Sequence, residues 1–393
     1  MIDQVRTTRL TNGLTILSEH MPELRSVSLG IWLRRGSRHE SSALNGICHF
    51  IEHALFKGTR RRTAHELATE SDRLGGQFDA YTTHEMTGFA AKVVDTEMPR
   101  AFDLLADMVV NPRFDEDDLV KMIEDTPDEL LTELFHAAYF PDHSLGRPIE
   151  GTEQTVSTFD RSITADFHRL NFTPSNLVVA AAGNVEHNRL VDLVTAAFGG
   201  EDKRSEHQAA SPAPAVAAPI LIERKSELEQ AHLIIAAPWP SAKDPDRYAA
   251  SMLGTIIGGG TSSRLWQSIR EERGLAYSIG AGGNTFSDVG MFTIYAGTSP
   301  AQMDQVFDLS LHELRRIVRD PVAEDELELA KQQAISSVLL SLESSSTRVG
   351  ALARQEIIHG RRISPDEIIT PALSVGALGN LNGFAVDRSR LEI

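Results

Sequence analysis

The alternation of apolar and polar positions along the chain predicts several strands and helices. A period of two residues predicts strands, and apolar residues that recur every three or four positions predict helices. On this basis we expect strands at residues 14–18, 26–33, 177–182 and 231–237, and helices at residues 64–74, 247–257 and 324–341. Long helices beside alternating strands favour the α+β class, in which helices and sheets pack as layers around a core.

One strand–turn–helix pattern occurs twice. Residues 87–110 and 289–314 each begin with an alternating strand, continue through a turn that contains Pro99 or Pro300, and end in a helix. Proline is favoured near a helix start because the N–H that it lacks would be unpaired there. The apolar positions are Phe102, Leu105 and Met108 in the first helix and Val306, Leu309 and Leu311 in the second. The repeat predicts two structurally similar, duplicated halves; the alternative is a chance similarity within an α+β chain.

A segment without hydrophobic periodicity separates the two halves. Residues 199–219 read GGEDKRSEHQAASPAPAVAAP and are rich in alanine, proline, serine and charge. This composition is typical of a linker. We therefore expect an N-terminal domain at residues 1–199, a linker at 200–218 and a C-terminal domain of similar fold at 219–393.

Composition and charge narrow the classes of function. Of the 393 residues, 41% are hydrophobic and 24% are charged, as in ordinary globular proteins. The formal net charge of −17 argues against nucleic acid or a membrane surface as a partner, because both need a cationic excess. The single cysteine, Cys48, cannot form an internal disulfide and is expected to be a buried core residue. With no apolar run near the ~18 residues of a membrane span, we expect a cytoplasmic protein.

Residues 49–53 read HFIEH and form the most specific chemical motif in the chain. In a helix, positions i and i+4 lie on one face, so His49 and His53 can direct two imidazole nitrogens at one cation. Glu52 lies beside them, and a carboxylate next to a bound water can serve as the general base of a metal-dependent hydrolase. The alternative is a helix with two surface histidines and a solvated glutamate.

Three longer phrases surround or follow this motif. They are LNGICHFIEHALFKGT at residues 44–59, LGGQFDAYTTHEMTGFAAKV at 74–93 and SLGRPIEGTEQTV at 144–156. With them the chain resembles the inverted-zincin peptidases, namely pitrilysin, insulinase and the mitochondrial processing peptidase with their small bacterial relatives. The resemblance extends over almost the whole chain and implies a zinc-dependent metalloendopeptidase that cleaves unfolded peptides or presequence-like segments. His49 and His53 would bind Zn2+, and Glu52 would activate the water that attacks the peptide carbonyl.

The resemblance also implies where the substrate binds. Asp79 and Ala80, where family members usually carry Asn-Ala, would lie on an edge strand to which the peptide adds as a further strand. Arg270 and Tyr277, in the phrase SIREERGLAYSI, would match the family's substrate-contacting pair; without the resemblance they read as a surface arginine and a half-buried tyrosine. The two halves would form a clamshell around a chamber, and the protein would be a homodimer or a heterodimer with a related subunit.

We assign no catalytic role to four other polar residues or to a glycine-rich stretch. Glu85 falls on the predicted strand and either contacts substrate or faces solvent. His84, His136 and His143 lack partners at ligand spacing and are expected to be structural. The stretch GGGTSSR at residues 258–264 has no lysine at P-loop spacing and predicts a turn before a helix.

The third zinc ligand is where the chain departs from the family pattern. A catalytic zinc site usually has three protein ligands and one open position. In the family, the third ligand is a glutamate on a helix that precedes a phrase like KMIEDTPDEL. Here FDEDDLV runs directly into that phrase, so Val120 follows Leu119 where the glutamate is expected. Glu124 and Glu129 are the candidate substitutes.

The same comparison indicates a second missing segment at Thr370, where ISPDEII passes directly into TPALSVGALGNL. The absent third ligand motivates a second functional hypothesis. In it, the chain is a catalytically inactive family member that acts as a scaffold or as the non-catalytic partner of another subunit.

Overall fold

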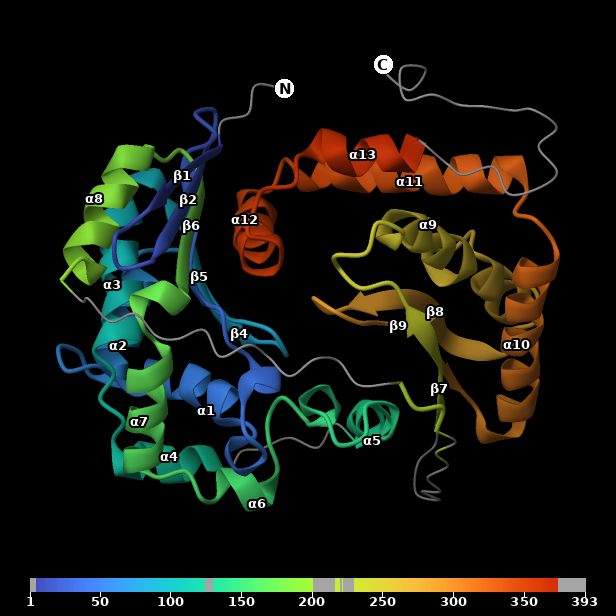
Figure 1. Cartoon of the computed structure of the whole chain (residues 1–393), viewed down its shortest axis with the longest axis horizontal. Helices are drawn as coiled ribbons and strands as arrows, with labels where there is room; N and C mark the ends of the chain where they lie inside the picture. Colours follow the sequence, from blue (N-terminus) through green and yellow to red (C-terminus); the bar gives the residue numbers. More distant parts are fainter. Residues whose placement is uncertain (1–4, 124–129, 201–215, 220, 222–229, 374–393) are drawn as a thin grey trace. The chain divides into compact units, whose positions relative to one another are not determined.

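The structure of the protein is a computed structural model that describes residues 5–123, 130–200, 216–219, 221 and 230–373. The chain divides into two compact units (Figure 1). Unit 1 comprises Met1–Ala217 together with Leu342–Arg362, and unit 2 comprises Ala218–Ser341 and Ile363–Ile393. Each unit has a sheet of its own and a hydrophobic cluster of its own.

Unit 1 is built on a 6-stranded sheet with the strand order β1-β2-β6-β3-β5-β4. Its strands are β1 (Val5–Arg9), β2 (Thr15–His20), β3 (Ser26–Leu33), β4 (Gln77–Thr82), β5 (Thr87–Val94) and β6 (Leu177–Gly183). Neighbouring strands are antiparallel except β2 and β6, which are parallel. β1 and β4 therefore form the two edges of the sheet.

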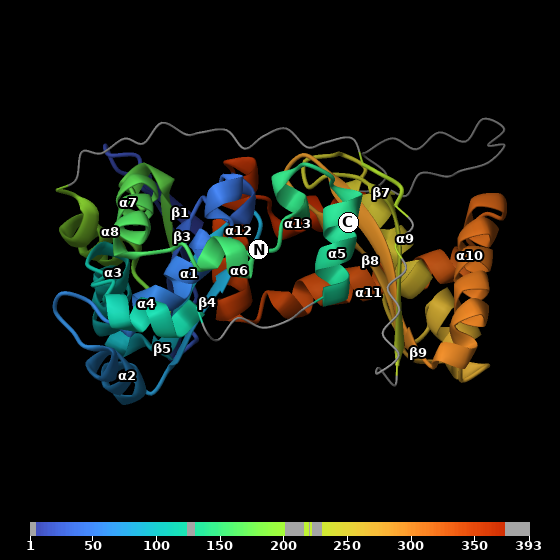
Figure 2. The same cartoon turned by 90° about the horizontal axis from the view of Figure 1, so that it is seen from below.

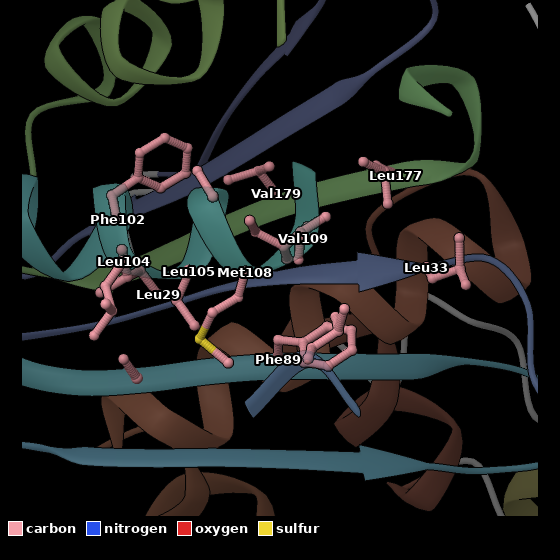
Figure 3. Close-up of a cluster of buried hydrophobic side chains, with 14 of the residues drawn as sticks. Leu29, Leu33, Phe89, Phe102, Leu104, Leu105, Met108, Val109, Leu177 and Val179 are labelled. Atoms are coloured by element: carbon pink, nitrogen blue, oxygen red, sulfur yellow. The ribbon is translucent and has the colours of Figure 1, made fainter. Parts of the chain in front are cut away.

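One face of this sheet packs against α3 (Met98–Val110) and α8 (His187–Phe198) (Figure 1). Phe102, Leu105 and Met108 of α3 lie in the same buried cluster as Leu29 and Phe89 of the sheet, as Figure 3 shows. Full burial of an apolar side chain of this size stabilises the fold by about 1.5–3 kcal/mol. The spacing of three seen in the sequence is thus the core face of α3.

The opposite face of the same sheet is covered by α12 (Ser345–His359), which is remote in the sequence (Figures 1 and 2). Val349, Leu352 and Ala353 of α12 share a buried cluster with Trp32 and Val178. Because apolar groups cover both faces, every residue of β6 is buried. This explains why β6 reads as a nearly continuous apolar run.

Polar contacts fix the position of α12 on the sheet. The buried carboxylate of Glu356 forms ion pairs with Arg9 at 2.9 Å and with Arg34 at 3.0 Å. At the other end of the helix, the Ser345 and Ser28 hydroxyls form a hydrogen bond of 2.9 Å. The segment Leu342–Arg362 consequently belongs to unit 1, whereas the sequence reading assigns all of residues 219–393 to the C-terminal domain.

Unit 2 repeats part of this plan. Its strands β7 (Ala231–Trp239), β8 (Ala276–Thr285) and β9 (Gly290–Thr298) form a sheet with the order β7-β9-β8. Both pairs are antiparallel, as they are in the β3-β5-β4 part of unit 1. The helices α9 (Arg247–Gly258) and α10 (Met303–Arg319) contribute Ile257 and Val306 to the cluster that covers this sheet. The repeated strand–turn–helix pattern and the α+β class are confirmed.

The expected elements are all present, with ends that shift by one or two residues at most. The other helices are α1 (Ile47–Ala54), α2 (Ala64–Arg73), α4 (Glu116–Ile123), α5 (Leu130–Tyr139), α6 (Glu153–Val156), α7 (Arg161–Asn171), α11 (Glu324–Ser341) and α13 (Pro365–Leu373). Within the part of the chain that the structure describes, no helix has the length and apolarity needed to cross a membrane. Most of the expected linker, residues 200–218, lies outside the described residues.

If α12 is an integral part of unit 1, Leu352→Ala lowers the free energy of unfolding of that unit by about 2–5 kcal/mol, because it leaves a cavity beneath the sheet. Leu352 is 6% exposed, whereas Leu340, the matched control on α11, is 66% exposed. Leu340→Ala changes stability by no more than about 0.5 kcal/mol. Urea unfolding in a Trp239→Phe, Trp266→Phe background uses Trp32 as the single reporter. Equal effects of the two substitutions contradict the assignment.

Candidate metal centre

The motif HFIEH lies on α1, as its spacing predicts. The residues of this helix that join the core of unit 1 are Ile47, Phe50, Ile51 and Ala54. Their spacing of three and four residues places His49 and His53 on another face, where His49 is half-buried and His53 is exposed. Burial of the apolar face thus leaves both imidazoles available to a ligand.

The two imidazoles meet at the nitrogens that metals use. His49 Nε2 and His53 Nε2 are 3.1 Å apart, and the ring centroids are 4.5 Å apart in an edge-to-face arrangement. Two nitrogens that each lie about 2.0–2.1 Å from one tetrahedral zinc ion are about 3.3 Å apart, so the pair fits such an ion. Burial, and then the charge of His53, lowers the pKa of His49 to about 4. His49 is therefore neutral near pH 7, as a metal ligand must be.

Glu52 is a buried carboxylate on the same helix. Its side chain is 7% exposed, and its Oε2 accepts a hydrogen bond of 2.9 Å from the Thr82 hydroxyl. Burial raises the pKa of Glu52; the Thr82 hydrogen bond and His53 oppose this, and the charge of Asp79 adds to it. Among the described residues, the Thr82 hydroxyl is the one hydrogen-bond donor to Glu52, which leaves the carboxylate with lone pairs of the kind that a proton acceptor needs.

β4 forms one edge of the sheet, and α1 packs against it. The expectation of an edge strand at Asp79 and Ala80 is confirmed. Ala80 packs against the core, and Asp79 is exposed. The Trp32 indole donates a hydrogen bond of 2.8 Å to the Tyr81 hydroxyl and so ties the edge strand to the interior. An edge strand presents unpaired backbone groups to which an extended peptide can add.

Glu85 is not on the strand, contrary to the expectation. It lies in the turn between β4 and β5, where its carboxylate forms a 2.7 Å ion pair with the fully buried Arg38 side chain. The turn contains no Gly or Pro, so the sequence offers no clear breaker there.

His84, His136 and His143 make internal contacts, as expected of structural residues. The His84 ring stacks on that of His136 with centroids 6.0 Å apart, and His84 Nδ1 forms a hydrogen bond of 2.8 Å with the Ser37 hydroxyl. Burial lowers the pKa of His84 to about 3. His143 Nδ1 accepts a 3.1 Å hydrogen bond from the Leu145 amide.

The described residues contain no group of three or more His, Cys, Asp and Glu side chains that could hold a metal ion. Both candidate third ligands, Glu124 and Glu129, lie outside the described residues. Cys48 is buried as expected. Burial, and then the charge of Glu40, raises its pKa well above the ordinary value, so it is a protonated thiol and a poor ligand.

Arg270 and Tyr277 lie in unit 2 on two irregular pieces of backbone. Arg270 belongs to a π-helical segment, Trp266–Glu271, and its guanidinium lies 4.1 Å from the centroid of the Trp266 ring. Tyr277 is the extra residue of a β-bulge in β8 and is 62% exposed. π-helical turns and bulges occur often at functional sites. Their role in substrate binding stays a prediction.

Thr82, the only hydrogen-bond donor to Glu52 in the part of the chain described, is not among the residues expected at the site. Strand alternation was the signal that could have found it. Phe78 and Ala80 pack against the core beneath β4, and Thr82 follows them at the same spacing of two.

Comparison with known proteins decides the family. The family model described as Insulinase (Peptidase family M16) matches residues 15–153, and the one described as Peptidase M16 inactive domain matches residues 159–334. An uncharacterized zinc protease of Streptomyces coelicolor is 38% identical over 392 residues, which cover 95% of this chain and 85% of the relative. The chain belongs to the M16 (insulinase) family of peptidases. An uncharacterized zinc protease of Bacillus subtilis is 37% identical over 388 residues, covering 95% of this chain and 93% of its own.

Solved structures show the M16 fold at lower identity. A protease from Helicobacter pylori matches with a TM-score of 0.83 and 20% identity, covering 94% of this chain and 96% of that chain. A peptidase M16 inactive domain from Pseudomonas fluorescens matches with a TM-score of 0.84 and 21% identity, covering 95% and 92%. The resemblance recognised in the sequence is confirmed at the level of family and fold.

If His49 and His53 are the metal-binding pair of this M16 chain, the purified protein carries about one zinc ion per chain. Replacing both histidines with alanine lowers zinc affinity by more than about 100-fold, because no imidazole ligand remains on α1. His65→Ala, which alters an exposed histidine on the neighbouring α2, leaves the zinc content unchanged. Metal analysis after gel filtration measures the zinc content of the wild type, the double variant and His65→Ala. Stoichiometric zinc in the double variant contradicts the assignment.

Proposed function

We propose that this chain is a zinc-dependent metalloendopeptidase that hydrolyses unfolded peptides or presequence-like segments. The observation that carries the proposal is the 3.1 Å approach of two imidazole nitrogens beside a buried carboxylate, on a helix that packs against an edge strand. Membership of the M16 family and the naming of relatives as zinc proteases support the same chemistry.

His49 and His53 would hold the zinc ion, with Glu124 or Glu129 as the candidates for a third ligand. When bound, zinc polarises a carbonyl group and lowers the pKa of water. The neutral state of His49 and its approach to His53 suit this role.

Glu52 would act as the proton carrier of the hydrolysis. Its carboxylate accepts a proton from the attacking water, whose oxygen forms a bond to the peptide carbonyl carbon. Glu52 then returns that proton to the leaving nitrogen as the C–N bond breaks. Both steps need a carboxyl whose pKa lies nearer to neutrality than that of a solvated glutamate, and burial shifts Glu52 in that direction.

β4 would bind the substrate as an added strand. Main-chain hydrogen bonds to the free edge at Asp79 and Ala80 hold an extended peptide with little regard to its sequence. An unfolded segment can offer such a strand along its whole length, which accounts for the class of substrate in this proposal.

Arg270 and Tyr277 would contact substrate, as the matching pair does in the family. Tyr277 is left out of the backbone pairing of β8 with β9, and its large side chain is exposed. The cation–π contact with Trp266 orients the guanidinium of Arg270. Assembly as a homodimer, or as a heterodimer with a related subunit, belongs to this proposal.

A second candidate is a catalytically inactive M16 chain that binds peptides or a partner subunit without cleaving them. The sequence around Val120, which lacks the phrase that carries the family's third ligand, favours it. Zinc content separates the candidates, because the enzyme needs the metal and the scaffold does not.

The catalytic assignment predicts that Glu52→Gln lowers kcat for a quenched fluorescent peptide by about 10²–10⁴-fold, because an amide cannot accept the proton. Zinc content stays that of the wild type, since Glu52 is not a ligand in this proposal. Glu23→Gln, which alters an exposed carboxylate, is the matched control and keeps full activity. Unchanged peptide cleavage by Glu52→Gln would falsify the mechanism.

Strand addition to β4 makes a separate prediction. Successive backbone N–H groups of a bound peptide point alternately toward β4 and away from it. In a scan of single N-methyl groups along a ten-residue peptide, affinity for the Glu52→Gln variant falls about 2- to 12-fold at every second residue. Fluorescence anisotropy measures the binding, with the unmethylated peptide as the reference. A uniform profile, or one without period two, contradicts strand addition.

A further inference from the structure

The start of α1 is held by a buried acidic residue that none of the proposed chemistry uses. Glu40 follows a short 3-10 helix, Ser37–His39, and is 5% exposed. Its Oε2 accepts a hydrogen bond of 2.8 Å from the Gly46 amide, and its Oε1 accepts one of 2.8 Å from the Cys48 amide. The carboxylate therefore spans the beginning of the helix that carries the histidines.

These contacts meet two needs of a short helix. The first amides of a helix have no carbonyl partner within it, and they favour a negative charge. Glu40 supplies both an acceptor and a charge. The N-cap residue of α1 is Gly46, which has no side chain that could cap the helix. Cys48, whose amide Glu40 holds, directly precedes His49 in the chain.

A third segment fixes Glu40 and its partner Asn45. The Arg147 guanidinium donates a hydrogen bond of 2.6 Å to the Glu40 carbonyl oxygen. Asn45 Nδ2 donates to Glu40 Oε2 at 3.3 Å and to the Pro148 carbonyl at 2.9 Å. The phrase at residues 144–156, which the metal site itself does not use, thus helps to anchor the start of α1.

Gly46 shows how closely these segments approach. Its φ is +95°, and a Cβ at this position would lie 2.4 Å from the Glu150 carbonyl oxygen. The chain therefore enters α1 along one narrow path, which sets the rotation of the helix about its axis. That rotation decides where the His49 ring lies.

We propose that Glu40 is a positioning residue for the His49–His53 pair: by holding the Gly46 and Cys48 amides, it fixes the first turn of α1 and so preorganises the two imidazoles. Its effect on metal binding rests on the proposed function. Its effect on the order of the first turn does not, because it follows from the hydrogen bonds alone.

The variant Glu40→Gln tests this inference. Glutamine has nearly the size of glutamate, but its amide nitrogen can only donate, so one of the two backbone N–H groups loses its acceptor. Competition with a chromophoric chelator gives the affinity for zinc alone, and hydrogen exchange with mass spectrometry gives the protection of residues 46–50. We expect zinc affinity to fall about 10- to 100-fold and exchange in the first turn to quicken, with the sheet of unit 1 unchanged.

Glu356→Gln is the matched control. Glu356 is also 5% exposed and lies in unit 1, but it is on α12, where it pairs with Arg9 and Arg34. We expect Glu356→Gln to lower the melting temperature, as the loss of a buried, paired carboxylate does, without changing zinc affinity or hydrogen exchange in α1. Equal losses of zinc affinity in the two variants would show general destabilisation and overturn the inference.

Two further outcomes are decisive. If Glu40→Gln does not fold, Asn45→Ala removes a bond to the same carboxylate and gives a smaller effect, about two- to ten-fold in zinc affinity; no change overturns the inference. If the wild type takes up no zinc, the proposed function fails and exchange alone decides. Faster exchange confined to the first turn of α1 then supports the positioning role, and unchanged exchange refutes it.

Discussion

The burial of one face of α1 is the constraint on which the site depends. Ile47, Phe50 and Ile51 lie in the core of unit 1, and the helical period then assigns His49 and His53 to another face. Burial also brings α1 against β4. The same hydrophobic contact therefore pairs the imidazoles and sets them beside an edge strand.

The two imidazoles are positioned by the helix that carries them. His49 Nε2 and His53 Nε2 lie 3.1 Å apart on a helix whose apolar face is buried in the core, so the fold itself brings the pair together. A preorganised pair binds a cation more tightly than a floppy one, because less side-chain freedom is lost on binding. The hydrogen bond from the Thr82 hydroxyl holds the carboxylate of Glu52, the proposed proton acceptor, in a similar way.

The sequence predicted the parts of this structure that depend on local periodicity or on a specific phrase. The strands, the helices, the repeat and the positions of His49 and His53 belong to this group. Strand alternation marks the face on which Thr82 lies, but its contact with Glu52, 30 positions away, becomes visible only in the fold. Glu40 contacts the Gly46 and Cys48 amides, six and eight positions away, and hydrophobic periodicity does not reveal hydrogen bonds to backbone groups. The packing of α12 on unit 1 was equally hidden, since composition marks a linker but not a later return of the chain.

X-ray absorption at the zinc K-edge, on the purified chain with one equivalent of zinc, shows directly whether His49 and His53 bind the metal. If they do, the spectrum contains two imidazole nitrogens at about 2.0–2.1 Å, with oxygen as the remaining ligands. Zinc that does not bind, a spectrum without imidazole, or sulfur at about 2.3 Å, which would make Cys48 a ligand, contradicts this assignment.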